Sequence, residues 1–246
     1  MSSDNDNTPH APLPLIAQLL SARRRATSSL RSCERNRGCL LCEHTTKQRR
    51  LALCERCERV CVAWSINAPS ALEELTPWVV SAMPYHGPLY QALQQAKGGD
   101  LYTARRLAQL ITSLPNAERS TTPLIVGDPL LLVPLPPRRA RLIKRGFSLQ
   151  HLCATQLARA LHSDVQLAPR ALSRARASSP QSSLSREARL NAQRDTLSAS
   201  SAVQGRAVCL LDDVCTTGAT LVEARRACLA AGAHAVEALT LFYARS

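Results

Sequence analysis

One segment near the end of the chain restricts the fold more than any other. The apolar run 207–211 ends in the acid pair Asp212 and Asp213, and a threonine- and glycine-rich turn then leads into a helical stretch at 220–231. A further strand is expected at 236–243. Strand, loop, helix and strand in this order form a βαβ unit, which predicts an α/β fold with a parallel sheet covered by helices.

The turn after the acid pair has the composition of a phosphate-binding loop. It reads Thr216, Thr217, Gly218, Ala219 and Thr220. Consecutive backbone N–H groups at a helix N-terminus attract anions, and a glycine lets a phosphate approach the backbone closely. The two carboxylates would repel phosphate but suit the hydroxyl groups of a ribose. These features predict a site for a phosphorylated sugar; the alternative is an ordinary strand-to-helix turn with a capping threonine.

A second feature is a cysteine cluster, since residues 33–61 hold six of the ten cysteines. Cys39 and Cys42 form one C-x-x-C pair, and Cys54 and Cys57 form another after eleven intervening residues. Two such pairs predict a tetrahedral structural zinc site, which would stabilise a module too small to fold on its own core. The alternatives are a redox or iron–sulfur role and four unconnected buried thiols. Three spare donors lie nearby: Cys33, His44 and Cys61.

The distribution of charge favours an anionic partner. The chain carries a net charge of +13, and between Arg138 and Arg194 there are twelve Lys or Arg against two Asp or Glu. Such an excess attracts phosphates, either on a small molecule or on nucleic acid, although a solvated arginine-rich surface is the alternative. Aromatic residues make up only 3%, which argues against a stacking platform for single strands.

Composition along the 246 residues predicts three parts. Residues 1–32 read as a disordered tail and a short basic helix, 33–65 as a zinc-ribbon-like module, and 75–246 as the main domain. No secretory signal and no apolar stretch of roughly 20 residues is found, so a cytoplasmic protein is expected.

Other elements of the main domain are expected from local patterns. Strands are predicted at 78–82 and 130–133, and a helix is predicted at 89–114 with an interruption at Gly98 and Gly99. A second helix carries Leu149 and Leu161 on its apolar face. Residues 168–186 are predicted to be a mobile loop.

The acid pair and its loop resemble the phosphoribosyl pyrophosphate loop of type I phosphoribosyltransferases. In that family the acids contact the ribose 2′- and 3′-hydroxyls and the loop holds the 5′-phosphate. Further motifs, together with the cysteine module, resemble the ComF family over residues 33–244. They are Tyr85-His86-Gly87-Pro88, then Lys97 with Gly99-Asp100, then Val133-Pro134-Leu135-Pro136, then Lys144-Arg145-Gly146-Phe147, and finally Gln181, Leu184-Ser185-Arg186, Arg189 and Asn191.

The resemblance implies a type I phosphoribosyltransferase-like domain that binds phosphoribosyl pyrophosphate with Mg²⁺. Expulsion of pyrophosphate needs cations facing the leaving group, and Arg145 and Lys97 are the candidates, with Arg186 and Arg189 closing over the site. ComF proteins are linked to DNA uptake in natural competence, and GntX relatives to gluconate use or iron–sulfur handling. Two alternatives to an enzyme stay open: a ligand-sensing module, and a non-catalytic accessory that binds single-stranded DNA or DNA-uptake proteins. The acceptor, a general base and a homodimer are not determined.

The chain departs from the family pattern at two places. Ser148-Leu149 stands where Asn-Gln is usual, which leaves a side-chain amide contact near Arg145 unsupported. Lys97-Gly98 stands where Lys-Phe is usual, so an aromatic anchor for Lys97 is missing.

Overall fold

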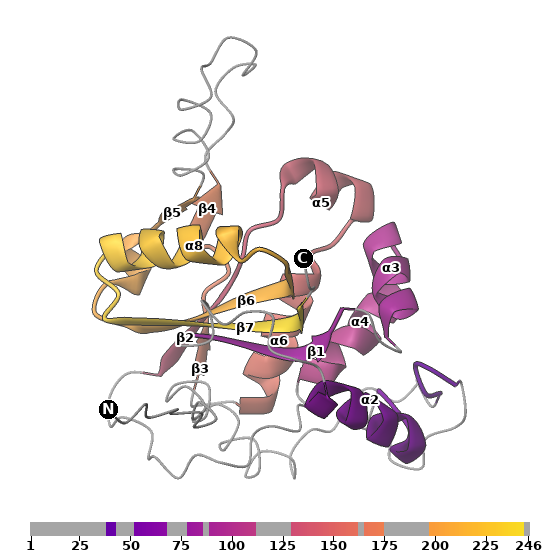
Figure 1. The fold of residues 1–246 in the computed structure, drawn as a ribbon. Helices are drawn as coiled ribbons and strands as arrows, with labels where there is room; N and C mark the ends of the chain where they lie inside the picture. Colours follow the sequence, from indigo (N-terminus) through magenta and orange to yellow (C-terminus); the bar gives the residue numbers. More distant parts are fainter. Residues whose placement is uncertain are drawn as a thin grey trace, which may run out of the picture.

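The computed structural model describes residues 38–42, 52–67, 78–85, 89–111, 129–161, 165–174 and 197–243 (Figure 1). The expected tail and basic helix at 1–32 lie outside these ranges. So do Cys33, His44, Arg186 and Arg189.

The centre of the fold is a five-stranded sheet in which every pair of neighbouring strands is parallel, as the βαβ pattern predicts. Its strands, in spatial order, are β1 (Val79–Pro84), β7 (Ala235–Tyr243), β6 (Ala207–Cys215), β2 (Leu130–Pro134) and β3 (Val165–Leu167). A separate antiparallel pair consists of β4 (Leu172–Arg174) and β5 (Leu197–Ala199). The α-helices are α2 (Glu55–Asn67), α3 (Tyr90–Gly98), α4 (Leu101–Leu110), α5 (Arg139–Arg145), α6 (Leu149–Leu161) and α8 (Ala219–Ala230), with a 3₁₀ turn at Ser201–Val203.

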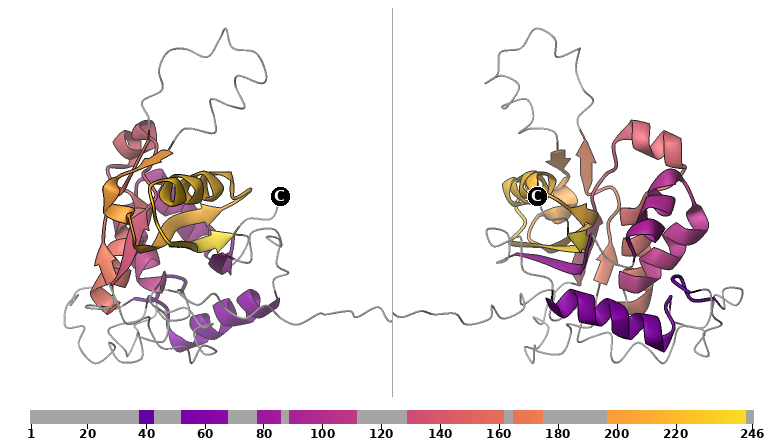
Figure 2. Two further views of the ribbon diagram at one scale, coloured as in Figure 1. Left: turned by 90° about the vertical axis from the view of Figure 1, so that its left-hand side faces the viewer. Right: turned by 45° about the vertical axis from the view of Figure 1, so that its right-hand side comes forward.

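Helices cover both faces of the sheet (Figures 1 and 2). Along β2, Leu130 and Leu132 join the apolar cluster that includes α3, α4 and α6, whereas Leu131 and Val133 join the cluster that includes α8. Successive side chains of a strand point to opposite faces. A strand covered on both sides must therefore be apolar throughout, which explains the continuous apolar runs of the sequence.

The connections between strands reverse direction between β2 and β6. From β2 the chain passes through α6 to β3 on one side, and from β6 it passes through α8 to β7 on the other. These two helices cover opposite faces, and the ends of β2 and β6 lie side by side, with Pro134 opposite Leu211. In open parallel sheets ligands bind at the carboxyl ends of the strands at such a reversal. The fold therefore places the predicted acid pair where a ligand site is expected.

The strand before the loop is longer than the apolar run suggests. Strand β6 continues through Asp212 and Asp213 to Cys215, because its backbone stays paired with β7 as far as Tyr243. The predicted loop at 168–186 also contains strand β4, which pairs with β5.

The interruption at Gly98 and Gly99 is confirmed, because α3 and α4 are separate helices. Gly99 ends α3 with a left-handed φ of 116°, which a residue with a side chain rarely adopts. The Asp100 carboxylate then caps α4 by accepting hydrogen bonds from the N–H groups of Tyr102 and Thr103, at 2.9 and 3.2 Å. This pair of residues explains the Gly-Asp part of the family motif.

Helix α5 was not expected from the sequence. It has no buried residue, so it carries no apolar stripe that a periodic pattern could reveal. It ends at Gly146, whose φ is 77° and whose N–H donates to the Leu142 carbonyl at 2.8 Å. Phe147 then packs against the core. Within the described ranges, no helix combines the length and apolar character needed to cross a membrane.

Candidate functional site

The acid pair lies at the carboxyl end of the central strand β6. Asp213 is buried and Asp212 is partly buried. The Asp212 Oδ1 atom accepts the N–H of Asp213 at 2.8 Å, and Asp213 Oδ1 accepts the N–H of Val214 at 2.9 Å. The backbone thus fixes both carboxyl groups next to each other.

A glutamine that the sequence did not indicate joins the two acids. The Gln150 Nε2 group, in the first turn of α6, donates to Asp212 Oδ1 at 3.1 Å and to Asp213 Oδ1 at 3.2 Å. Residues 148 and 149 lack the side-chain amide of the family's Asn-Gln pair, and Gln150, at the next position, supplies an amide instead. The available signal was its place at the start of the helix that follows the Arg145-Gly146-Phe147 motif.

The surroundings of the acid pair disfavour two negative charges. Burial, the neighbouring charge of Asp213 and the hydrogen bond between the two carboxyl groups raise the pKa of Asp212 to about 8, although hydrogen bonds from Gln150 and from the Asp213 N–H act in the opposite direction. Ionisation of Asp212 beside Asp213 is therefore disfavoured in the ligand-free protein. A ligand that donates hydrogen bonds to both carboxylates would favour their ionised form.

The predicted phosphate loop joins β6 to α8. Thr216 and Thr217 are exposed, and the buried Gly218 precedes the helix with a left-handed φ of 71°. The Gly218 carbonyl accepts the first helical hydrogen bond, from Val222 N–H at 2.9 Å, and Thr217 Oγ1 accepts the N–H of Ala219 at 3.4 Å. The N–H groups of the first helical turn point out of the helix end, as an anion site requires.

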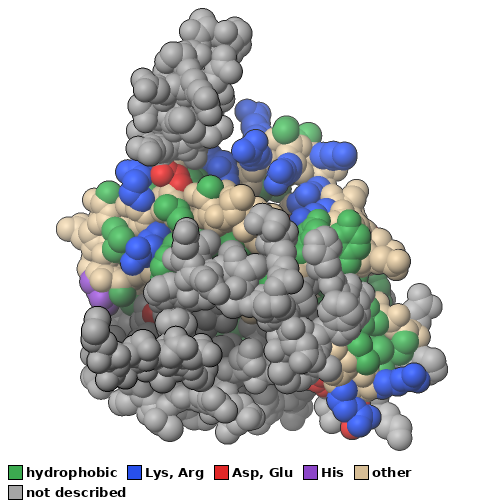
Figure 3. All heavy atoms as spheres, viewed as in Figure 1, with side chains coloured by type: hydrophobic (Ala, Val, Ile, Leu, Met, Phe, Trp, Pro, Cys, Tyr) green, Lys and Arg blue, Asp and Glu red, His purple; other side chains and the backbone are tan. Residues whose placement is uncertain are grey.

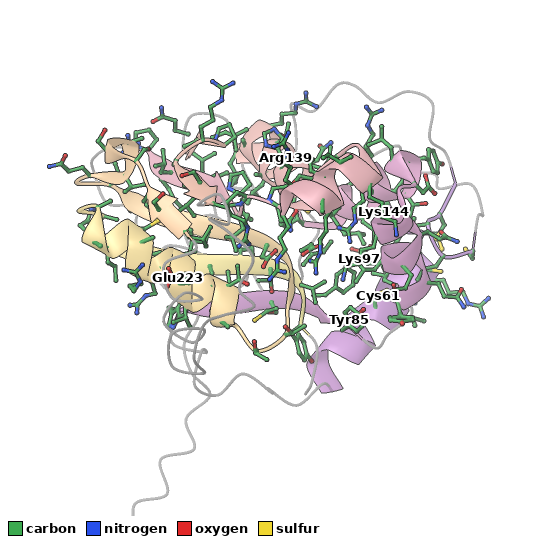
Figure 4. All side chains as sticks on the ribbon, turned by 90° about the horizontal axis from the view of Figure 1, so that it is seen from above. Cys61, Tyr85, Lys97, Arg139, Lys144 and Glu223 are labelled. Carbon is green, nitrogen blue, oxygen red and sulfur yellow. The ribbon has the colours of Figure 1, made fainter. Side chains whose placement is uncertain are left out.

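The two predicted cations lie on helices outside the sheet. Lys97 is in the last turn of α3. Its Nζ atom lies 5.1 Å from the ring centre of Tyr85, the residue that directly follows β1 (Figure 4). This cation–π contact replaces the aromatic anchor that is missing at Gly98. Arg145 is partly buried at the end of α5. No hydrogen bond or ion pair links either cation to the acid pair within the described part of the chain.

Arg174 is a cation near the acids that the sequence did not single out. Its Nε donates to the Pro136 carbonyl, in the segment after β2, at 2.7 Å. Burial lowers its pKa and so do the charges of Arg138 and Arg141, whereas Asp212 raises it. Arg174 therefore binds the backbone of the proline-rich segment after β2 and lies close enough to Asp212 for their charges to interact.

The four predicted zinc ligands come together. The Sγ atoms of Cys39, Cys42, Cys54 and Cys57 all lie within 4.8 Å of one another, and those of Cys42 and Cys54 are 3.6 Å apart. Tetrahedral Zn–S bonds of about 2.3 Å place neighbouring sulfurs about 3.8 Å apart, so this donor set fits zinc. Cys61, one of the spare donors, is buried one turn further along α2 and is not part of the cluster.

Electrostatics at the cluster agree with metal ligation. Burial acts to raise the pKa of Cys39, but backbone hydrogen bonds at Cys54, Leu41 and Cys42 outweigh it and lower the pKa to about 6. Burial raises the pKa of Cys57 above its ordinary range, and the other three cysteines add to this effect. Four thiols this close cannot all ionise without a cation, and a metal ion such as zinc could supply that charge.

An arginine of the main domain binds the backbone of the cysteine module. Arg106 in α4 is only 3% exposed, and its guanidinium donates to the carbonyls of Gly38 and Ala52, the latter at 3.0 Å. The N–H of Leu40 donates to the same Ala52 carbonyl at 2.8 Å. Arg106 thus holds both cysteine-bearing segments against α4.

Comparison with known proteins agrees with this arrangement. The family model described as "Phosphoribosyl transferase domain" matches residues 151–246. The protein called DNA utilization protein YhgH from Escherichia coli is 31% identical over 202 residues, which cover 81% of this chain and 87% of the relative. The proteins of the same name from Shigella flexneri and Salmonella typhimurium are each 30% identical, with the same shares covered.

Proposed function

Since this chain belongs to the ComF family and carries a phosphoribosyltransferase domain, we propose that it binds phosphoribosyl pyrophosphate or a related phosphoribosyl compound in the cytoplasm. One observation carries the proposal. At the reversal between β2 and β6, two adjacent carboxyl groups directly precede a loop that opens a helix through a left-handed glycine. The acids suit ribose hydroxyls, and the loop suits a 5′-phosphate.

The reaction proposed is transfer of the phosphoribosyl group to an acceptor. The bond between ribose C1 and the pyrophosphate oxygen breaks, its electron pair leaves with pyrophosphate, and the acceptor nucleophile bonds to C1 and gives up a proton. Asp212 and Asp213 hold the ribose hydroxyls, the loop from Thr216 to Thr220 holds the 5′-phosphate, and Arg145 and Lys97 neutralise the leaving group. Mg²⁺ bound with the substrate would add positive charge at the pyrophosphate.

Titration with two ligands tests this assignment. Asp212→Asn and Asp213→Asn each remove an acceptor for a hydroxyl, so affinity for ribose 5-phosphate and for phosphoribosyl pyrophosphate should fall about 10- to 100-fold. Arg145→Ala should weaken only phosphoribosyl pyrophosphate, since only that ligand has the leaving group. Calorimetry with Mg²⁺ gives both affinities, and Arg159→Ala, an exposed arginine of α6, is the control.

The outcomes separate the competing functions. If wild-type protein binds neither ligand, the site is not a phosphoribosyl site and the proposal fails. Binding together with release of pyrophosphate in the presence of an acceptor supports the enzyme, whereas binding without any turnover favours a ligand-sensing module.

A second function, binding of single-stranded DNA, is favoured by the surface of α5. Arg138, Arg139, Arg141 and Lys144 are all exposed there, and Figure 3 shows lysine and arginine side chains gathered over this helix. Leu142 and Ile143 are 40% and 73% exposed, so apolar side chains lie among the cations. We propose that α5 contacts the phosphate backbone. The relatives named for DNA utilization support this role.

Salt dependence tests the contact at α5. Affinity for an oligonucleotide should fall as salt rises, with a log–log slope of about −0.7 for each neutralised phosphate. The double variant Arg139→Ser, Lys144→Ser should make that slope shallower by roughly 1.4, while Arg56→Ser, Arg159→Ser, which removes the same charge elsewhere, should not. Fluorescence anisotropy at several salt concentrations measures the slopes. Binding that ignores salt, or that depends strongly on base sequence, would contradict an electrostatic contact.

A further inference from the structure

One side chain outside β6 bonds to both members of the acid pair. The Gln150 amide uses its two N–H bonds on the Oδ1 atoms of Asp212 and Asp213, at 3.1 and 3.2 Å. The backbone N–H groups of Asp213 and Val214 also donate to Oδ1 atoms, and the two carboxyl groups contact each other. Among the described residues, no donor from outside the pair bonds to either Oδ2 atom, so a ligand can reach these two oxygens.

Ser148 determines which end of the amide meets the acids. Its hydroxyl donates to Gln150 Oε1 at 3.0 Å and accepts the N–H of His151 at 3.2 Å, as a helix-capping serine does. An amide has a donor end and an acceptor end. Because the acceptor end is occupied by Ser148, the donor end is the one directed at the carboxylates.

The phase of α6 explains why this glutamine reaches the acids. Leu149 is 2% exposed and, with Cys153 and Leu157, forms the buried face of the helix. The next position is rotated by about 100° from that face, which brings Gln150 to the end of β6. The family's Asn-Gln pair is absent at 148 and 149, yet an amide is retained one residue later, with a serine placed to orient it.

The other ionisable groups around the pair do not take over this role. Cys153 on α6 is fully buried, and burial raises its pKa far above neutral, so it carries no charge. The same holds for Cys215 after the pair, whose pKa is about 11 as a result of burial. Arg174 on β4 contributes positive charge but makes its hydrogen bond to Pro136. Among the described residues outside the pair, Gln150 is the one whose side chain donates hydrogen bonds to the two acids.

We propose that Gln150, oriented by Ser148, is the positioning residue of the ribose site: its amide fixes both carboxylates through Oδ1 and favours their ionised form, so that the two Oδ2 atoms can accept vicinal hydroxyls. This inference rests on the proposed function of the site. Without the amide, the second carboxyl group of the pair would have to ionise next to a charged neighbour, with no side-chain amide hydrogen bond to offset the repulsion.

The test is calorimetric titration of ribose 5-phosphate with Mg²⁺ between pH 7 and 9. The ligand's hydroxyls need the ionised pair, and the pKa of Asp212 is about 8 in the ligand-free protein. Wild-type affinity should therefore rise with pH, by up to about tenfold per pH unit, and level off above about pH 8. Gln150→Met keeps the side-chain length but removes the amide. It should bind about 10-fold more weakly at pH 7 and level off at a higher pH.

Further variants sharpen the result. Gln150→Glu adds a third carboxylate and should weaken binding by more than Gln150→Met. Ser148→Ala removes the hydrogen bond to Oε1, so the Gln150 amide can rotate by 180°. The affinity of this variant for ribose 5-phosphate should lie between those of wild type and Gln150→Met. Gln156→Met, elsewhere on α6, is the control and should match wild type.

A second measurement does not depend on the ligand. Carboxyl ¹³C NMR titration of the ligand-free protein should show the upper pKa of the pair higher in Gln150→Met than in wild type. If wild type binds ribose 5-phosphate and Gln150→Met shows the same affinity, the same pH profile and the same carboxyl titration, the role of Gln150 is refuted while the proposed function stands. If wild type does not bind at all, the proposed function itself fails and this inference falls with it.

Discussion

Gly218→Val is expected to abolish binding of ribose 5-phosphate and phosphoribosyl pyrophosphate. Gly218 has a φ of 71° and directly precedes α8. This conformation is strongly unfavourable for a β-branched residue such as valine. Any side chain at this position would also occupy space where a phosphate would approach the backbone. Loss of both the loop geometry and the space should lower affinity by more than about 100-fold, which is more than removal of one hydrogen bond achieves.

The control for this experiment is a glycine with a similar positive φ and no role in the site. Gly205 has a φ of 67°, and an added Cβ would meet no atom within 4 Å. Gly205→Val should therefore suffer a similar conformational penalty, about 1–2 kcal/mol, and still bind. Thermal unfolding and calorimetry on both variants separate the two effects. If Gly218→Val binds within tenfold of wild type, the phosphate does not lie on this loop.

The second large effect is expected from loss of zinc. We expect one zinc per chain, and we expect Cys54→Ser or Cys57→Ser to lose it and to lower the Tm by roughly 10 °C or more. Structural zinc contributes about 10–16 kcal/mol to folding in isolated zinc-finger peptides, and each kcal/mol corresponds to about 2–4 °C in a domain of this size. Part of the effect should reach the main domain, because the module shares a core cluster with α4 and α6.

Metal analysis and thermal unfolding measure both outcomes. Cys61→Ser is the matched control: this cysteine is buried in the same module but is not one of the four clustered sulfurs, so zinc should be retained. A folded protein without zinc, or a coloured iron–sulfur species, would overturn the assignment.

The parts of the site that the sequence predicted are contiguous in the chain. The acid pair, the loop and the cysteine pairs could be identified because each motif carries its own chemistry within a few residues. The positions of the acid pair and the loop in the fold followed from the βαβ pattern, since parallel strands bring their carboxyl ends together. Whether the cysteine module and the main domain are separate units stays a prediction.

The residues that the sequence did not reveal act over long distances. Gln150 meets acids that are 62 and 63 residues away, and Arg106 meets carbonyls 68 and 54 residues away. Nothing in the local pattern distinguishes Arg106 from the exposed Arg105 beside it. Helix α5 was missed for a local reason: it has no buried residue, so its sequence shows no periodic apolar pattern.

The order of strands in the sheet has a consequence for how the chain is made. Among the described strands, β1 pairs with β7 alone, so Val79 gains its neighbour Ala238 only after β7 is made. Strand β2 likewise completes its pairing only after β6 is made. During synthesis from the N-terminus, two central strands of the sheet emerge from the ribosome last. Until then, the apolar faces of β2 and of the α3–α4 pair have no finished sheet to pack against. The cysteine module is made before any strand of the sheet and can be closed by a metal ion, so we expect it to become ordered before the sheet does.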